Sequence, residues 1–313
     1  MATPIKIFFV TDVHGSNVCY RKFLNALKVY NVDVGILLGD LTGKMLIPLV
    51  EKAGGGWMTT FMGRQTEVTT QEELDKLKKT IEMVGYYWVH LSHDEFEYYK
   101  SDKQKLDALF NELMLQRLRQ WIHLADERLA GTSYKVYMAA GNDDHMEVDD
   151  VIEDSSAIAN CNEKLVMIGD HQMITFSWTN PTPWDTPREK PDEQLEPMLE
   201  KLISKVTDMS NAIFNFHAPP YGSSLDMAPE LTKDLVQAAD RKIPVGSKAV
   251  KKMIEKYHPL LGLHGHIHES RGVQKIGRTT VINPGSEYSE GILKGVVVIL
   301  EKGKVKDYVF TNG

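Results

Sequence analysis

Seven side chains that bind metals well each follow a short apolar run in the sequence. They are Asp12, His14, Asp40, Asn142, His217, His266 and His268. A short apolar run is consistent with a buried strand of a parallel sheet, and open α/β sheets bind ligands at the carboxyl ends of such strands. We therefore expect the seven side chains to meet at one edge of the fold and to bind divalent metal ions there.

The spacing of these residues favours two metal ions over one. Asp12 and His14 are two positions apart, so an extended backbone would point both side chains the same way. His266 and His268 repeat this spacing. Two such pairs and a shared carboxylate at Asp40 could hold two cations about 3.5–4 Å apart. Imidazole and carboxylate ligands suit Mn, Fe, Zn, Ni or Co better than Ca, and the absence of cysteine from the set argues against a structural zinc site.

Three of the seven residues directly follow a glycine. These glycines are Gly39, Gly141 and Gly265. Glycine has no Cβ, so the backbone at these positions can approach the metal ions closely. The sequence therefore predicts a backbone that passes close to the metal ions.

The composition places the chain among ordinary globular proteins. Its 313 residues suffice for one large domain, and we interpret 1–313 as a single domain. The net charge of −7 argues against a broad electrostatic surface for nucleic acid. Two cysteines imply no disulfide framework. The first residues have the pattern of a strand and not of a signal peptide, and the sequence contains no long apolar span. We therefore expect a cytoplasmic protein that does not bind membranes.

The order of elements predicts a mixed α/β fold. Residues 5–10, 17–30 and 32–38 have the patterns of a strand, a helix and a strand, as in a βαβ unit. Further strands are expected at 134–139, 165–168, 172–178, 212–216 and 260–263. The last strands, at 273–276, 279–282, 295–300 and 304–310, are expected to form one closing antiparallel set. This order favours two sheets that face each other, with helices outside.

Residues 44–131 interrupt this pattern and are expected to form a helical insertion. Thr70 and Glu73 have the spacing of a capping box before an amphipathic helix, and a longer helix is expected to begin near residue 101. We interpret the insertion as a cap or a partner surface, with 54–56 as a glycine hinge. Residues 179–196 are rich in proline and charge and are expected to form a surface loop.

The motifs DxH, GD, GN, a single His and GHxH, in that order, resemble those of the calcineurin-like metallophosphoesterases. The segment VINPGSEY at 281–288 is similar to a turn of the compact prokaryotic members. The resemblance covers both flanks of the chain but not the insertion. It implies an αββα sandwich, a metallo-dependent phosphatase-like fold, with the metals at the tips of its two central sheets.

The resemblance also implies a role for each of the seven residues. The first metal would be bound by Asp12, His14 and His268. The second would be bound by Asn142, His217 and His266. Asp40 would bridge the two, and a hydroxide between the cations would attack a phosphoester in line.

One position departs from the family pattern. Where most members have GNH, this chain has Asn142-Asp143-Asp144-His145, a GNDD variant. The missing His normally serves the leaving group. A carboxylate beside two cations should have a lowered pKa, so Asp143 would donate a proton poorly. The leaving group would then depart without that acid, or His145 or a water on the substrate side would donate the proton. Related compact phosphoesterases also lack this His and resemble diesterases, so the resemblance favours phosphodiester substrates. Thr42 or Lys44 is expected to face the substrate phosphate.

Other functions are compatible with the same motifs. The enzyme could be a phosphomonoesterase or a nucleotide pyrophosphatase, and a catalytically weak binding scaffold would preserve the same fold. The expected substrate is a small phosphoester or a nucleotide, and the negative charge makes long nucleic acid a poorer candidate. His264, beside the candidate ligands, is expected to have a supporting role only.

Overall fold

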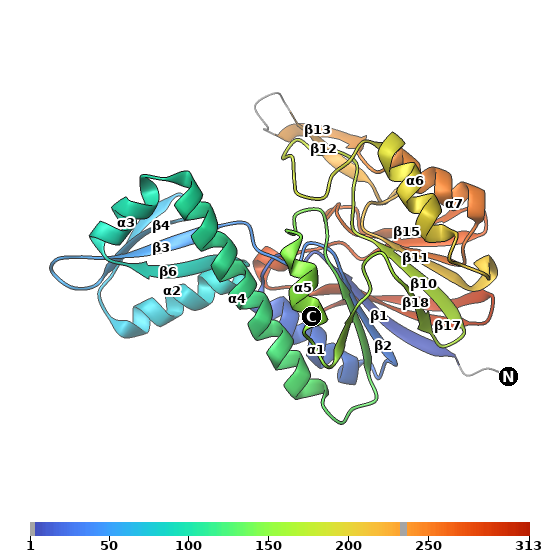
Figure 1. Cartoon of the computed structure of the whole chain (residues 1–313), viewed down its shortest axis with the longest axis horizontal. Helices are drawn as coiled ribbons and strands as arrows, with labels where there is room; N and C mark the ends of the chain where they lie inside the picture. The colour runs from blue at the N-terminus through green and yellow to red at the C-terminus, as the bar shows by residue number, and fades with distance from the viewer. Residues whose placement is uncertain (1–3, 232–236) are drawn as a thin grey trace.

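Within residues 4–231 and 237–313, which the computed structural model describes, two six-stranded sheets lie face to face (Figure 1). The strand order of the first sheet is β18 (Lys304–Asn312), β17 (Lys294–Glu301), β1 (Ile5–Thr11), β2 (Val34–Leu38), β7 (Lys135–Ala139) and β8 (Ile158–Asn160). Strands β1, β2, β7 and β8 are parallel, and β17 pairs antiparallel with β1. All five residues of β2 are buried, as expected for an inner parallel strand covered on both faces.

The second sheet is also parallel at its centre. Its order is β15 (Gly272–Ile276), β16 (Thr279–Asn283), β14 (Leu261–Leu263), β11 (Ala212–Phe216), β10 (His171–Phe176) and β9 (Leu165–Ile168). The prediction of one closing antiparallel set is wrong, because β15 and β16 belong to this sheet while β17 and β18 belong to the first. The connection that contains η2 (Tyr288–Glu290) passes from one sheet to the other. Alternating apolar residues indicate a strand but do not indicate which sheet it joins.

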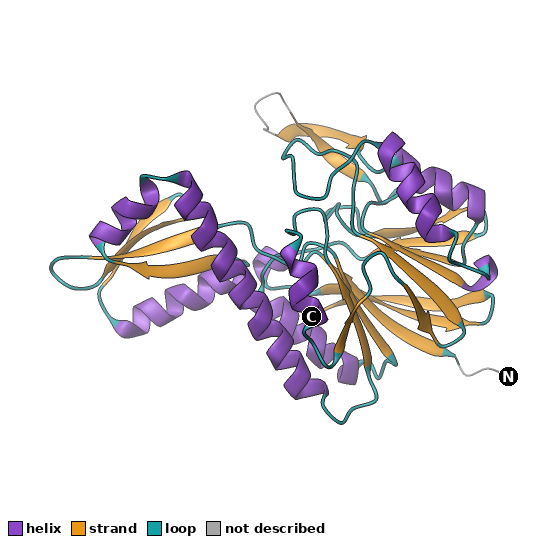
Figure 2. Cartoon of the chain, in the orientation of Figure 1, coloured by secondary structure: helices purple, strands orange, loops and turns teal. Residues whose placement is uncertain are grey.

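Helices cover the outer face of each sheet (Figure 2). Helices α1 (Asn17–Val29) and α5 (Glu147–Glu153) pack on the first sheet. Helices α6 (Asp192–Ile203) and α7 (Lys248–Tyr257) pack on the second. The inner faces of both sheets form one shared core, and the predicted αββα sandwich is confirmed.

Residues 44–131 form an α/β body, so the prediction of a purely helical insertion is wrong. The body contains a four-stranded sheet in the order β5 (Arg64–Val68), β4 (Trp57–Phe61), β3 (Leu46–Glu51) and β6 (Tyr87–Leu91). Its helices are α2 (Gln71–Met83), α3 (His93–Lys100) and α4 (Lys103–Leu129). The predicted capping box at Thr70 and Glu73 is confirmed at the start of α2. Figure 1 shows this body to one side of the sandwich, with α4 running from it along the sandwich.

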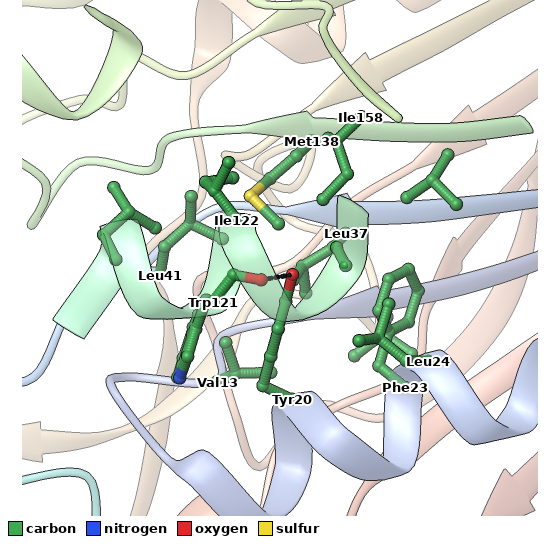
Figure 3. Packing of buried hydrophobic residues seen from close by; sticks show 14 of the residues in the cluster. Val13, Tyr20, Phe23, Leu24, Leu37, Leu41, Trp121, Ile122, Met138 and Ile158 are labelled. Carbon is green, nitrogen blue, oxygen red and sulfur yellow. Dashed lines mark hydrogen bonds between the residues drawn. The ribbon is translucent and has the colours of Figure 1, made fainter. Parts of the chain in front are cut away.

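Helix α4 belongs to both parts of the molecule. Its later turns enter the core outside the first sheet, where the ring of Trp121 stacks on Tyr20 of α1 with 4.3 Å between ring centroids. The Tyr20 hydroxyl donates a hydrogen bond of 2.9 Å to the Trp121 carbonyl (Figure 3). These contacts attach the inserted body to the sandwich through a packed helix.

Two further expectations about connections need correction. Residues 54–56 join the paired strands β3 and β4, so they lie inside the inserted sheet and not at a hinge between the two bodies. The predicted loop at 179–196 ends early, because α6 begins at Asp192, and Arg188 within it is buried. A small hairpin of β12 (Met227–Leu231) and β13 (Gln237–Pro244) completes the described strands. The helices of the described residues are all too short or too polar to cross a membrane.

Candidate metal centre

Parallel strand pairing brings the candidate ligands to one end of both sheets. In the first sheet, Leu38 pairs with Thr11 on one side and with Ala139 on the other, so the loops after β1, β2 and β7 leave the sheet together. In the second sheet, Asn215 of β11 pairs with Leu263 of β14. The loops after these five strands contain the seven candidate ligands, and the structure brings all seven together.

The first group of side chains joins Asp12, His14, Asp40 and His268. Their ligand atoms lie within 4.8 Å of one another. The Nε2 atom of His14 lies 3.6 Å from Asp40 Oδ2, and His268 Nε2 lies 3.6 Å from Asp12 Oδ1. Two imidazoles and two carboxylates are a donor set suited to a divalent transition metal.

The second group joins Asp40, His217 and His266, whose ligand atoms also lie within 4.8 Å of one another. The Nε2 atom of His217 lies 3.4 Å from Asp40 Oδ1 and 3.1 Å from the amide oxygen of Asn142. Asp40 belongs to both groups, with one carboxylate oxygen near His14 and the other near His217.

The electrostatics of the protein alone fit a cation at this position. Asp12 Oδ1 is buried and has no hydrogen-bond partner among the described residues. Burial lowers the pKa of His217, but Asp40 and Asp12 outweigh it and raise this pKa to about 9. Burial likewise raises the pKa of Asp40, but His217 and His14 hold it well below its usual range. The carboxylates are thus ionised and need a positive charge beside them, which a proton on His217 or a divalent cation can supply.

The backbone of the centre is held in an unusual conformation. Asp12, His14, Asp40 and His266 have φ angles of 55°, 40°, 40° and 67°. Positive φ is uncommon for residues other than glycine, and such strained positions gather at functional sites. The strain accompanies the sharp turn by which each chain segment leaves its strand and points its side chain inward.

The three glycines beside the ligands have no room for a side chain. A Cβ on Gly39 would lie 2.1 Å from His217 Nδ1, and one on Gly141 would lie 2.3 Å from Asp40 Oδ1. A Cβ on Gly265 would lie 2.0 Å from Thr11 Oγ1. The glycines therefore allow the candidate ligands themselves to pack closely.

Neighbouring groups fix the orientation of the ligands. Thr11 Oγ1 and the amide of His266 both donate to Asp12 Oδ2, at 2.6 and 3.0 Å, which leaves Oδ1 free to face the centre. The side-chain amide of Asn142 donates to Thr186 Oγ1 at 2.8 Å. Sequence reasoning missed Thr11 and Thr186. Thr11 is adjacent to a ligand in the sequence, but no local pattern points to Thr186.

Asp143 has a different environment from the one expected. Burial and the nearby Asp40 raise its pKa to about 7, against the opposing effect of Lys44. The expected lowering assumed two bound cations, whereas in the protein alone burial dominates. Asp143 forms an ion pair with Lys44, and its Oδ2 lies 3.7 Å from His14 Nδ1. The amide of Asp143 donates to Asp40 Oδ1 at 3.0 Å.

A cavity of about 330 Å³ lies beside Asp143. Its lining includes Thr42, Lys44 and His145, so the structure brings together the residues predicted to serve the substrate. The hydroxyl of Thr42 donates to Asp144 Oδ1 at 2.6 Å, and that proton is therefore directed away from the cavity.

Asp144 was not singled out from the sequence, yet it joins two loops of the centre. It is fully buried and accepts hydrogen bonds from the amides of Leu41, Thr42 and Gly141 at 2.8–2.9 Å. Tyr288 was also missed, and its ring centroid lies 4.5 Å from that of His14. His264 belongs to neither group, and its Nδ1 atom lies 2.9 Å from the Phe216 carbonyl oxygen.

Comparisons with known proteins identify relatives of the chain and support its fold. The family model described as calcineurin-like phosphoesterase matches residues 5–270. The uncharacterized protein MJ1162 of Methanocaldococcus jannaschii is 36% identical over 162 residues, which are 50% of this chain and 68% of that protein. The crystal structure of TT1561 of Thermus thermophilus has a TM-score of 0.53 at 14% identity and covers 99% of both chains. Another crystal structure, also 14% identical and covering 99% of both chains, has a TM-score of 0.59. At this identity the two structures support the fold alone.

Proposed function

Because the chain belongs to the calcineurin-like phosphoesterase family, we propose that it is a hydrolase that cleaves a phosphodiester with two divalent metal ions. The observation that carries the proposal is the position of Asp40, whose two carboxylate oxygens face two separate groups of ligands. Bound Mn, Fe, Zn, Ni or Co ions would activate a water and neutralise charge on the phosphoryl oxygens.

The residues of the chain would hold the metals in the two groups described above. Asp12, His14 and His268 would bind one ion, with Asp40 shared between both. Asn142, His217 and His266 would bind the other. The hydrogen bonds that Asp12 accepts and that Asn142 donates support this assignment, because partners that fix ligand orientation typically raise metal affinity.

Two further residues are suited to act on the substrate. Lys44 is paired with Asp143, and about half of its side chain is exposed at the cavity. It would offer a positive charge to a phosphoryl oxygen. His145 lines the same cavity and is our candidate for protonating the leaving group, since histidine is the side chain that most often serves as a general acid.

Charge supports a diester over a monoester. The carboxyl group of Asp143 lines the cavity at the position where most family members have a histidine, and a like charge there weakens binding of an anion. A phosphodiester carries one negative charge, whereas a phosphomonoester carries up to two near neutral pH. The cavity volume of about 330 Å³ is at the low end for a small-molecule site. We therefore propose a small phosphoester or a nucleotide as substrate in place of long nucleic acid.

The test compares bis(4-nitrophenyl) phosphate with 4-nitrophenyl phosphate. Metal-stripped wild-type protein is reloaded separately with Mn, Ni, Zn and Mg. The variant Asp40→Asn and the control Asp170→Asn, at an exposed site, are treated in the same way. We expect diester turnover that requires metal, is lost in Asp40→Asn and is retained in Asp170→Asn. Faster turnover of the monoester would indicate a phosphomonoesterase. Two bound metals without turnover of either ester would favour a binding scaffold and contradict the proposal.

A further inference from the structure

The cavity beside the candidate metal centre has one polar wall and one apolar wall. The polar wall consists of Thr42, Lys44, Asp143, His145 and Thr186. The apolar wall consists of Phe110, Met114 and Trp184. Two polar-wall residues contact candidate ligands directly, since Asp143 donates its amide to Asp40 and Thr186 accepts from Asn142. The polar wall is thus continuous with the metal centre, and the apolar wall belongs to the same cavity.

The apolar wall on α4 is built by helical spacing. Phe110 and Met114 are four positions apart, so they lie on the same face of the helix. Leu106, one turn earlier, extends this face and is 40% exposed. The ring of Phe110 packs edge-on against Tyr87 of β6, with 5.5 Å between centroids. This contact holds the Phe110 ring in place.

Trp184, in the loop before α6, supplies the rest of the apolar wall. Its side chain is 64% exposed, although burial of an indole contributes strongly to stability. The cavity thus offers an accessible aromatic ring close to a candidate phosphate site.

The loop that contains Trp184 is held in position. The amide of Trp184 donates to Thr182 Oγ1 at 3.2 Å, and that hydroxyl donates to Glu189 at 2.6 Å. Arg188, which is 1% exposed, donates to the carbonyls of Asp144 and His145 at 2.9 and 2.8 Å. The loop is therefore bound to the segment that also contains Asn142 and Asp143. A pre-ordered wall loses little conformational freedom when a ligand binds.

We propose that this cavity binds a planar aromatic arm of the phosphoester substrate, such as a nucleobase, against Trp184. The inference rests on the proposed function, which positions the phosphate between the metal centre and Lys44. Aromatic rings bind bases by stacking, and loss of such a ring typically weakens binding by about tenfold or more. An aliphatic arm would fill the same space without the stacking contribution.

The test measures binding directly by calorimetry with Mn-loaded protein. Adenosine 5′-monophosphate is compared with ribose 5-phosphate, which has the same sugar and phosphate but no base. We expect the nucleotide to bind about tenfold more tightly in the wild type. In Trp184→Ala the ratio of the two Kd values should fall toward one, and Trp184→Phe should restore most of it. Tyr98→Ala, which removes an exposed aromatic side chain on α3, should retain the wild-type ratio.

Turnover of bis(4-nitrophenyl) phosphate by the same samples separates the two proposals. Metal-dependent turnover with equal Kd values for both probes would overturn the aromatic pocket and leave the proposed function intact. A Trp184-dependent Kd ratio without turnover would support the pocket and contradict the catalytic proposal. A Kd ratio that is equal in the wild type and in Trp184→Ala would overturn the role of Trp184. Quenching of fluorescence by the nucleotide in the wild type, but not in Trp184→Phe, would support it independently.

Discussion

The Nε2 atoms of His14 and His268 lie 3.1 Å apart, although 254 positions separate the residues in the chain. His14 follows a strand of the first sheet and His268 a strand of the second. A proton shared between the two nitrogens would give this pair a hydrogen bond. It would not give one to Asp12 Oδ1, which lies 3.6 Å from His268 Nε2 and has no hydrogen-bond partner among the described residues. A cation between them would satisfy all three atoms.

The first prediction tests this pair through metal binding. We expect His268→Asn to weaken Mn binding by about 100-fold or more. Loss of a group that only orients a ligand lowers metal affinity by roughly 10–100-fold, and loss of the ligand itself should lower the affinity further. Metal per chain is measured by elemental analysis after dialysis at fixed free Mn. His123→Asn, at an exposed site on α4, is the matched control. Equal metal content in both variants would refute the assignment of His268.

The second prediction concerns Gly39, which has a φ of 72° and whose Cβ would lie 2.1 Å from His217 Nδ1. Gly63 in the β4–β5 turn has a φ of 73°, with no described atom within 4 Å of its Cβ position. Alanine should cost about 1–2 kcal/mol at either site from backbone strain, and about 1–3 kcal/mol more at Gly39 from overpacking. Urea denaturation of the two variants gives the difference, and equal losses would show that His217 moves freely.

The positions of the candidate ligands could be predicted from the sequence because strand ends and short motifs are local features. Asp12 and His266 each follow an apolar run, and parallel pairing then brings such ends to one edge. The strands of the inserted body could not be predicted in the same way. The strand at Arg64–Val68 is mostly exposed and lacks a clear apolar alternation, so only its pairing with β4 makes it a strand.

Contacts between distant segments were also beyond sequence reasoning. Thr186 is 44 positions from Asn142, and Arg188 contacts the Asn142–His145 segment only because its loop folds back over it. A proline-rich and charged composition correctly indicated an irregular segment here. It gave no sign that an arginine within the segment would be buried, since burial of a charge depends on partners supplied by the tertiary fold.

The third prediction concerns the junction of the inserted body with the metal centre. A Cβ on Gly85, between α2 and β6, would lie 1.8 Å from the carbonyl oxygen of His14, and one on Gly43 would lie 1.8 Å from the Gly85 carbonyl oxygen. Both are backbone atoms, so they can move away from an added Cβ only if the surrounding chain segments shift. We propose that the inserted body is a cap docked on the centre through this contact.

We therefore expect Gly85→Ala to displace the His14 loop, to weaken Mn binding and to lower stability by about 1–3 kcal/mol. Gly55→Ala is the matched control, because Gly55 has a similar φ of 88° and its Cβ position is open among the described residues. Calorimetric metal titration of both variants checks the prediction. Unchanged affinity in Gly85→Ala would contradict a coupling between the cap and the centre.

The fourth prediction concerns Thr186 as a residue that positions Asn142. Thr186→Val removes the nearer acceptor of the Asn142 side-chain amide and leaves the longer hydrogen bond of 3.3 Å to Asp143 Oδ1, so the amide can rotate and its oxygen can leave the centre. We expect Mn affinity to fall by about 10–100-fold, and Thr186→Ser to retain affinity near that of the wild type. Direct metal titration is the measurement, because Thr186 also lines the substrate cavity and turnover would mix both effects. Equal affinity in the Val and Ser variants would exclude the positioning role.

The fifth prediction concerns pH and the attachment of α4 to the sandwich. Asp126 on α4 accepts hydrogen bonds from Ser155 Oγ and from the amides of Ser156 and Ala157 at 2.7–3.1 Å. Burial raises the pKa of Asp126, but these hydrogen bonds outweigh it and lower the pKa below 3.8. A carboxylate with a lowered folded-state pKa stabilises the protein fully above its unfolded-state pKa, and this stabilisation is lost as pH falls through the folded-state value.

Asp126→Ala should therefore lower the free energy of unfolding by about 1 kcal/mol near neutral pH, a modest value because the carboxylate is partly exposed. The difference from the wild type should shrink as pH falls below 3.8. Urea denaturation over a pH series measures it, with Asp170→Ala at an exposed turn as the control. A difference that is the same in acid as at neutral pH would mean that Asp126 stabilises the helix by packing, since packing does not depend on its ionisation.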